Sequence, residues 1–350
     1  IVATAPAPVP IRRRGMAAGV AGGALVAAAL LGIAIGPVGL RPAAVSGEMA
    51  DRVLPFLAVE SGLTDRHEAI LWELRVPRVV LAGLVGGTLA MAGGSYQGVF
   101  RNPLADPYLL GVAAGAGLGA TAAINAGAGS GDWILPLAAF AGGLVAVAAT
   151  YALGRIGGGR TTTATLILAG VAVASFFTSV QIFAQQLASN RIREVYSWIL
   201  GRLTTVGWSE VLVLLPFAVV SGAVLVAHGR HLDVLAVGEE EASTLGMRAG
   251  RVRLTIVVAA TLATAAAVSV SGLIGFVGII VPHAVRRITG ISYRAILPVS
   301  LLAGAAFLIL ADLIARTVIA PSEIPVGVVT AFVGAPFFAL ILARTRRGLV

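Results

Sequence analysis

Residues 254–285 form an uninterrupted stretch of 32 residues that contains no aspartate, glutamate, lysine or arginine. As a single helix it would be about 48 Å long, whereas the hydrocarbon core of a bilayer is about 30 Å thick. The segment VSVSGLIG, residues 268–275, supplies small residues for a turn that divides the stretch in two. An apolar stretch of this length predicts a membrane protein.

The overall composition supports the same class. Only 12% of the residues are charged, whereas soluble domains carry about a quarter. Cysteine is absent, which excludes disulfides and thiolate metal sites. The net charge of +9 comes from arginines dispersed at the ends of apolar runs, which indicates membrane topology and predicts no nucleic-acid partner.

Ten stretches are candidate transmembrane helices. They cover residues 16–36, 76–100, 107–127, 134–154, 164–187, 210–228, 254–271, 273–289, 295–318 and 325–343. The eighth is short, and short or glycine-interrupted spans often line a transport pathway. The sequence therefore predicts an all-α, polytopic membrane protein, with residues 16–345 as one transmembrane domain between tails at 1–15 and 346–350.

The distribution of arginine predicts the orientation. An even number of spans places both termini on one side, and that side carries 16 arginines and five acidic residues. The opposite side carries 9 arginines and ten acidic residues, and Asp312 lies inside a span. Because basic loops stay inside, we expect both termini in the cytoplasm of a bacterial cell and the chain in its cytoplasmic (inner) membrane. We also expect the first span to be retained, not cleaved as a signal peptide.

Glycines at four-residue spacing predict close helix packing within the lipid bilayer. They occur as Gly15/Gly19/Gly23, Gly83/Gly87, Gly94/Gly98 and Gly111/Gly115/Gly119.

The acidic segment GEEEASTLGM, residues 238–247, is unusual in so apolar a chain. Its glutamates are Glu239, Glu240 and Glu241. They would occupy the first turn of a short helix capped by Gly238, and Gly246 suits the left-handed residue that ends it. Ala242 and Leu245 are expected on one side of this helix. Its residues alone leave two interpretations equal, a solvated connector or a docking element for a cytoplasmic partner.

Three arginines and one aspartate lie at the predicted outer ends of spans. Arg75 and Arg78 are three residues apart and expected on one helical face. They are either interfacial anchors or a binding site for carboxylates of an external partner. Asp312 has Arg316 four residues on, which suits an ion pair within one helix. Arg316 could still expose part of its guanidinium group outside.

No catalytic or metal-binding pattern is recognisable. The sequence contains no P-loop, no Ser/His/Asp arrangement and no H-E-x-x-H motif, and its histidines lack further partners. We therefore do not expect an enzyme, and no catalytic or metal-ligating residue is assigned.

Seven motifs in order resemble the permease subunits of bacterial iron-chelate, haem and vitamin B12 ABC importers, the type II importer family. They extend from about residue 70 to 345: RVPRVVLAGLVGG, FRNPLADPYLLGV, TATLILAGVAV, GEEEASTLGM, GFVGIIVPHAVRRITG, LADLIAR and EIPVGVVTAFVGAPFF.

The resemblance implies a ten-helix subunit that dimerises, as a homodimer or with a related permease, above two ATP-binding-cassette subunits. Residues 238–247 would be the coupling element in a cleft of the ATPase. Arg75, Arg78 and Arg316 would look outward and pair with glutamates of a substrate-binding protein. ATP and Mg would be used by the partner ATPase, and no cofactor would be bound by this chain.

The same resemblance implies a cytoplasmic gate. It maps to Asn102 and Leu104 in one turn, and to Thr163 and Ala164 before the fifth span, where alanine replaces the family's polar residue. The outer helix of the family matches residues 193–203. In the fifth span, FFTSVQIFAQQLASNR could face the pathway with phenylalanine, glutamine and serine.

Other transport and enzyme classes fit less well. An ion-coupled secondary transporter needs ionisable residues inside the membrane, and only Asp312 qualifies. An intramembrane enzyme needs a nucleophile or a metal site. The sequence therefore favours an importer permease, with ferric siderophore as the expected cargo and haem or cobalamin as the alternatives.

Overall fold

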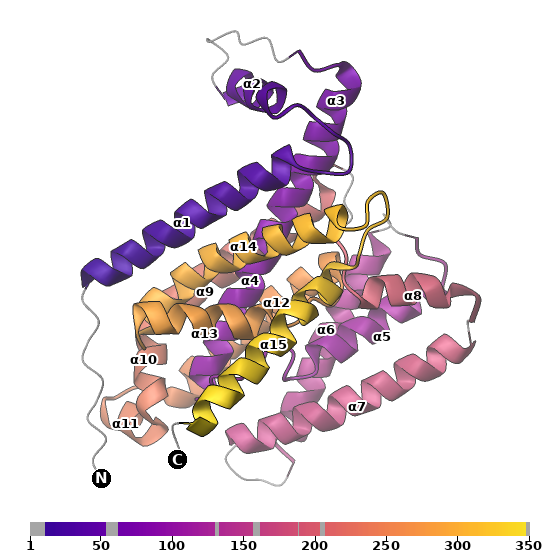
Figure 1. Cartoon of the computed structure of the whole chain (residues 1–350). Coiled ribbons are helices and arrows are strands. Elements are labelled where there is room, and N and C mark those ends of the chain that lie inside the picture. Colours follow the sequence, from indigo (N-terminus) through magenta and orange to yellow (C-terminus); the bar gives the residue numbers. More distant parts are fainter. Residues whose placement is uncertain are drawn as a thin grey trace.

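The structure is a computed structural model that describes residues 11–53, 62–129, 133–156, 162–187, 189–203 and 207–347. Ten of its helices coincide with the ten predicted spans to within a few residues (Figure 1). They are α1 (Ile11–Ala34), α4 (Val76–Val99), α5 (Val112–Asn125), α6 (Ile134–Leu153), α7 (Thr163–Leu187), α9 (Ser209–Ala227), α12 (Ala249–Ser271), α13 (Val277–Thr289), α14 (Tyr293–Thr317) and α15 (Val326–Arg347). The prediction of an all-α polytopic fold is confirmed.

The ten helices differ in length. In the described ranges, seven helical segments are long and apolar enough to cross a membrane, and they include α1, α4, α6, α7, α9, α12 and α14. Helix α5 has 14 residues because it begins only after the loop with Pro103 and Pro107. Helix α13 has 13 residues, in line with the marginal length expected for the eighth span.

The predicted break between the seventh and eighth spans is present at residues 272–276. Helix α12 ends at Ser271, and Gly272 has a positive φ of 67°. A Cβ atom at this glycine would lie 2.1 Å from the Trp198 carbonyl oxygen, so no larger residue fits there. Phe276, with a φ of 70°, precedes the first residue of α13. The apolar stretch therefore turns where its small residues predicted.

Helix α4 forms the centre of the bundle. Twenty of its 24 residues are buried, and it contacts α9, α12, α13 and α14. A Cβ atom at Gly86 would lie 2.3 Å from the carbonyl oxygen of Gly304, and one at Gly93 would lie 1.9 Å from that of Gly278. Glycine thus lets the backbones of α13 and α14 approach α4 closely.

The predicted glycine contacts are only partly present. Gly115 and Gly119 pack against the α6 backbone, where Cβ atoms would lie 2.2 Å and 2.1 Å from carbonyl oxygens. The expectation for Gly15, Gly19 and Gly23 is wrong, because a Cβ atom at these positions would meet no heavy atom within 4 Å. The face of α1 that carries them points away from the rest of the chain.

Short helices lie at both ends of the bundle. Helices α2 (Pro42–Val53) and α3 (Asp65–Ala69), followed by a π-helical turn at Ile70–Arg75, project from one end (Figure 1). Helix α8 (Ile192–Ile199), after the 3-10 turn Ser189–Arg191, follows α7. Helices α10 (Gly229–Val237) and α11 (Glu239–Thr244) lie at the opposite end, where α15 also ends.

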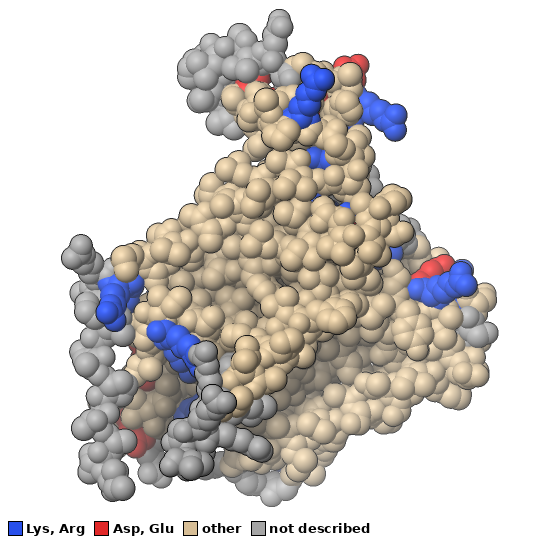
Figure 2. All heavy atoms as spheres, in the orientation of Figure 1, with Lys and Arg blue, Asp and Glu red and all other residues tan. Residues whose placement is uncertain are grey.

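Charged side chains on the face drawn in Figure 2 gather toward these two ends. The broad surface between them, over α1, α14 and α15, carries no acidic or basic group in this view. An uncharged band flanked by charged ends is the surface that a bilayer requires.

Candidate functional site

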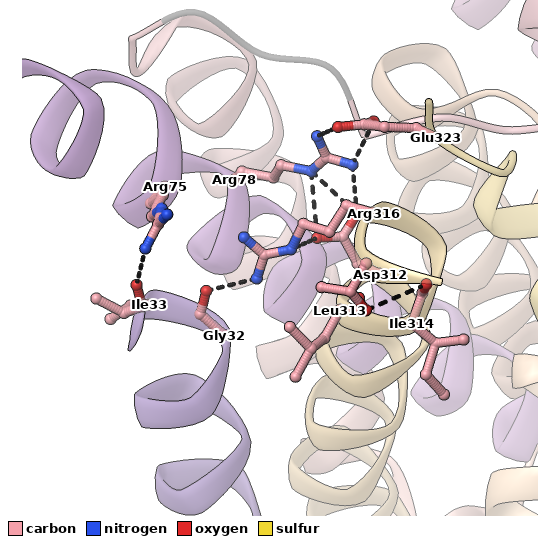
Figure 3. A network of polar contacts seen from close by, with 10 residues as sticks. Gly32, Ile33, Arg75, Arg78, Asp312, Leu313, Ile314, Arg316 and Glu323 are labelled. Carbon is pink, nitrogen blue, oxygen red and sulfur yellow. Dashed lines mark hydrogen bonds and ion pairs between the residues drawn. The ribbon is translucent and has the colours of Figure 1, made fainter. Parts of the chain in front are cut away.

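A network of charged side chains lies at the end of the bundle that carries α2 and α3. The guanidinium group of Arg78, on α4, donates from Nη2 to Oδ1 of Asp312 at 2.9 Å and from Nε to the same oxygen at 3.0 Å. It also donates from Nη1 and Nη2 to the two carboxylate oxygens of Glu323, both at 2.9 Å (Figure 3). Arg78 therefore connects α4 with α14 and with the loop before α15.

Arg316 lies deeper in the same network. Its Nε is 3.4 Å from Oδ2 of Asp312, so the predicted pair within α14 is present. Only 2% of the Arg316 side chain is exposed, and its Nη2 donates to the carbonyl oxygen of Gly32 near the end of α1. We call residues 75, 78, 312, 316 and 323 the arginine cluster. Its three arginines and two carboxylates give a net charge of +1.

Arg75 completes the cluster from the π-helical turn. Its Nη1 donates to the carbonyl oxygens of Ile33 and Ala34, both at 3.1 Å, and its Nη2 donates to that of Val38. Only 4% of the residue is exposed. The last carbonyl groups of α1 have no partner within the helix, and the C-terminal end of the helix dipole is negative. Arg75 and Arg316 therefore cap the C-terminus of α1.

This arrangement corrects part of the prediction. The three arginines converge at one end, but Arg75 and Arg316 are buried and do not look outward in this structure. Arg75 and Arg78 also do not share one outward face, because one donates to α1 and the other to α14. The carbonyl groups of α1, which no sequence pattern revealed, hold two of the three side chains inside.

Glu323 was missed by the sequence analysis. An acidic residue directly before an apolar span on the outer side was the only signal that could have indicated it. Its side chain is 38% exposed, whereas that of Asp312 is 1% exposed. It is therefore the accessible carboxylate of the cluster.

At the opposite end, α11 ends in the predicted way. Gly246 has a φ of 76°, and its amide donates to the Ser243 carbonyl oxygen while the Met247 amide donates to that of Ala242. These two bonds form a Schellman motif. The expectation that Ala242 and Leu245 share one side is wrong, because Ala242 is fully buried and Leu245 is 74% exposed. Leu245 follows the last helical residue, so helical spacing no longer sets its direction.

Polar contacts connect α10 with the bundle. The Asp233 carboxylate accepts hydrogen bonds from the Tyr293 amide and, at 2.8 Å, from the Ser292 hydroxyl group, and so caps the N-terminus of α14. Arg286 of α13 donates to the Tyr293 hydroxyl oxygen at 2.9 Å and to Oε1 of Gln97, on α4, at 3.1 Å. Asp233 therefore joins α10 directly to α14, and Tyr293 and Arg286 extend this connection to α13 and α4.

The predicted gate residues lie at the same end of the bundle. Asn102 accepts a hydrogen bond from the Leu104 amide at 2.9 Å, which shapes the turn between α4 and α5. Leu104 and Ala164 are exposed, and Thr163 is half-buried. Among the described residues no hydrogen bond joins the turn to Thr163 or Ala164, so the structure does not bring the two predicted halves into polar contact.

The rest of this turn is tied to the break at residues 272–276. The Tyr108 hydroxyl group donates to the Ile274 carbonyl oxygen at 2.9 Å and accepts from the Ile274 amide at 3.1 Å. Asp106 accepts a hydrogen bond from the Tyr108 amide at 2.7 Å. Burial raises the pKa of Asp106 to about 6, although this hydrogen bond favours the charged form. Two hydrogen bonds of Tyr108 therefore join the turn to the break.

An apolar groove of about 550 Å³ lies between α8, residue 273 and α15. Leu200, Leu273, Ala331 and Phe332 are among its lining residues. Helix α7 presents large apolar side chains to the outside, namely Leu168, Val171, Phe176, Val180, Ile182, Phe183 and Leu187.

Two of the three glutamines of α7 are turned away from this exposed face, whereas Gln186 is exposed. Gln181 and Gln185 are buried, and Nε2 of Gln181 donates to the Thr121 hydroxyl oxygen at 3.2 Å. The expectation that glutamine faces the pathway is therefore wrong for Gln181 and Gln185, and a partner on α5 satisfies one of these amides inside the bundle.

Metal ligands are not clustered in the described ranges, where no group of three or more His, Asp or Glu side chains is placed to hold an ion. The two ends of the bundle differ in their accessible groups, with an exposed carboxylate, Glu323, at one end and an exposed leucine, Leu245, at the other.

A protein-family model decides the classification. The model described as the FecCD transport family matches residues 24–344, which is most of the chain.

The chain belongs to the FecCD transport family.

Relatives of this FecCD permease come from several organisms. An uncharacterized ABC transporter permease of Bacillus subtilis is 42% identical over 80% of this chain and 80% of its own length. The cobalamin import permease of Halobacterium salinarum is 44% identical, over 81% of this chain and 76% of its own length. The Fe(3+)-hydroxamate import permease of Bacillus subtilis is 35% identical, over 84% and 81% of the two chains.

A solved structure agrees with this placement. It is described as a metal-chelate type ABC transporter in an inward-facing conformation, and it matches 94% of this chain and 99% of its own at 26% identity and a TM-score of 0.79. This FecCD permease is therefore a transmembrane subunit of an ABC importer and not an enzyme, since ATP hydrolysis belongs to a separate subunit. It is a multi-pass inner-membrane protein.

Proposed function

We propose that this FecCD permease carries a metal chelate into the cytoplasm, with a ferric siderophore as the first candidate. The observation that carries the proposal is the similarity, over about four fifths of the chain, to permeases named for Fe(3+)-hydroxamate and Fe(3+) dicitrate. Cobalamin is the second candidate, because the Halobacterium salinarum cobalamin permease is 44% identical to this chain. Both cargoes are large chelates that a weakly binding, apolar path would release readily.

The coupling step is assigned to α11 on the cytoplasmic side. Leu245 and the helix of residues 238–246 would sit in a cleft of the ATPase, which uses ATP and Mg. Ala242 packs against the bundle on the other side, and α10 contacts α14 through Asp233. These contacts support transmission of ATPase motion from α11 and α10 to α14, and the gate is assigned to Asn102, Leu104, Thr163 and Ala164.

A second permease copy, identical or related, would complete the pathway. The apolar surface of α7 and the groove beside α15 support this, because exposed apolar faces of this extent favour either lipid or a protein partner. Substrate would then pass along the axis between the two copies, with both termini on the cytoplasmic side.

The proposed function can be tested with the complete transporter. Tagged permease is purified from its native membranes in a mild detergent, its associated subunits are identified by mass, and the complex is reconstituted into vesicles. Uptake of radiolabelled ferric hydroxamate and of cobalamin is then measured with and without ATP. ATP-dependent uptake of the ferric chelate alone supports the first candidate, and uptake of cobalamin alone supports the second. Uptake driven by an ion gradient without ATP would contradict the importer mechanism.

Docking of the binding protein is assigned to the arginine cluster, with Arg78 as its most exposed arginine, at 14% against 4% for Arg75 and 2% for Arg316. Glu323 then competes with carboxylates of the binding protein for the same guanidinium group, because it already accepts two hydrogen bonds from Arg78. Glu323→Gln removes this competitor and is expected to tighten binding about threefold, whereas Arg78→Gln is expected to weaken it about tenfold. Titration of binding protein onto the permease complex in nanodiscs measures both.

Tighter binding by one variant and weaker binding by the other cannot both result from loss of the fold, because misfolding would weaken binding in each case. Glu323→Gln preserves the shape of the side chain, and the Arg78→Gln protein is accepted only if its thermal unfolding remains cooperative. Weaker binding by the Glu323→Gln protein would refute the competition, and unchanged binding by the Arg78→Gln protein would remove Arg78 from the docking surface.

A further inference from the structure

A second groove, of about 600 Å³, lies between α1, α13 and α14. Its wall is apolar along most of its length and includes Met16, Val20, Ala24 and Phe307. Two arginines, Arg13 of α1 and Arg287 of α13, line one end. The groove is therefore amphipathic, with positive charge at one end and hydrocarbon beyond it.

The apolar part of this groove lies where lipid is expected. Only 28% of the residues in the apolar window of α1 are buried within the chain, so most of this helix faces the surroundings. Met16 is 65% exposed and Val20 is 69% exposed. Because α1 is long and apolar enough to span a bilayer, an acyl chain is the natural occupant of a groove along it.

The charged end lacks an internal partner. Arg13 and Arg287 are both exposed, and among the described residues neither has a carboxylate within ion-pair distance. Figure 2 shows basic groups at the start of α1 and another beside α13, at one end of the uncharged surface. By contrast, Arg78 and Arg316 at the other end of the bundle are paired with Asp312.

The chemistry of this end suits a phosphate group. Guanidinium groups bind phosphate oxygens through paired hydrogen bonds, and basic pockets between transmembrane helices on the cytoplasmic side bind anionic headgroups. The groove lies at the end of the bundle that the arginine distribution assigns to the cytoplasm. A lipid whose headgroup lies on the two arginines would extend its acyl chain along α1.

We propose that the groove between α1, α13 and α14 is a binding site for an anionic phospholipid, with the headgroup phosphate on Arg13 and Arg287 and an acyl chain beside Val20 and Ala24. The site is independent of the transported cargo. It explains how α1 is held at both ends. Arg75 and Arg316 cap its C-terminus, and the lipid joins its N-terminal half to α13 and α14.

Native mass spectrometry of the full chain, with phosphatidylglycerol or phosphatidylcholine added in defined amounts, tests the site. The double variant Arg13→Gln/Arg287→Gln is expected to lose phosphatidylglycerol affinity about tenfold or more, because two charge-assisted contacts are removed. The double variant Arg230→Gln/Arg251→Gln is the matched control. It removes the same charge from exposed positions on α10 and α12 and should retain the affinity within about twofold.

A second variant tests the apolar half of the site without changing its charge. Ala24→Phe places a ring in the groove and is expected to lower phosphatidylglycerol binding about threefold or more. Equal loss in the control double variant, equal binding of phosphatidylcholine and phosphatidylglycerol, or unchanged binding by Ala24→Phe would each overturn the proposal. The first result would indicate only a diffuse charge effect, and the second only an unselective lipid annulus.

Discussion

Asp312→Asn is expected to destabilise the folded permease by about 3–5 kcal/mol, the usual cost of removing one partner from a buried ion pair. Asp312 is 1% exposed and accepts hydrogen bonds from Arg78 while it lies 3.4 Å from Arg316. The substitution raises the net charge of the arginine cluster from +1 to +2 in a region with little water. Thermal unfolding of the detergent-solubilised protein, followed by tryptophan fluorescence or by loss of the monodisperse peak, measures the effect.

Glu323→Gln is the matched control for this prediction. It makes the same chemical change in the same cluster, but its side chain is 38% exposed, so the expected loss is about 1 kcal/mol or less. If both variants unfold at the same temperature, burial does not govern the energetics of the cluster and the assigned role of Asp312 is wrong.

Leu245→Asp is expected to disconnect the permease from its ATPase. Burial of a leucine side chain in an interface contributes about 1.5–3 kcal/mol, and an unpaired aspartate there adds a further cost, so ATP-driven uptake should fall roughly tenfold or more. Because Leu245 is 74% exposed in the isolated chain, the unfolding temperature of the Leu245→Asp protein should equal that of the unsubstituted protein. Co-purification of the ATPase and uptake by vesicles measure the two effects separately.

Leu245→Met is the control for the coupling prediction, since it preserves size and apolar character and should retain coupling. Normal co-purification of the ATPase with the Leu245→Asp protein would contradict the docking role of α11. That result would return this segment to the other interpretation of its sequence, a solvated connector stabilised by its own glutamates.

Several features followed from local sequence because each depends on a few neighbouring residues. The ten spans are apolar stretches whose length the bilayer requires, and the ten helices coincide with them. The break after Ser271 and the left-handed Gly246 were predictable because glycine adopts such conformations without steric cost. Family membership followed from motif order, and the match to residues 24–344 confirms it.

Other features depended on which helix ends meet. Glu323 became visible as a partner of Arg78 only when the loop before α15 was placed beside α4. Gln181 turned inward because α5 offers a hydroxyl group, and Leu245 turned outward because α11 ends one residue before it.

The three arginines at the outer end show most clearly what local sequence determines and what tertiary contacts decide. The sequence by itself determined that Arg75, Arg78 and Arg316 lie at one end of the bundle, because span counting fixes the end at which each residue lies. Their directions were decided by the tertiary structure, since the nearest strong acceptors are the unpaired carbonyl groups at the end of α1 and a carboxylate on α14. Span positions arise from contacts between each residue and its solvent, whereas side-chain partners arise from contacts between segments far apart in the chain.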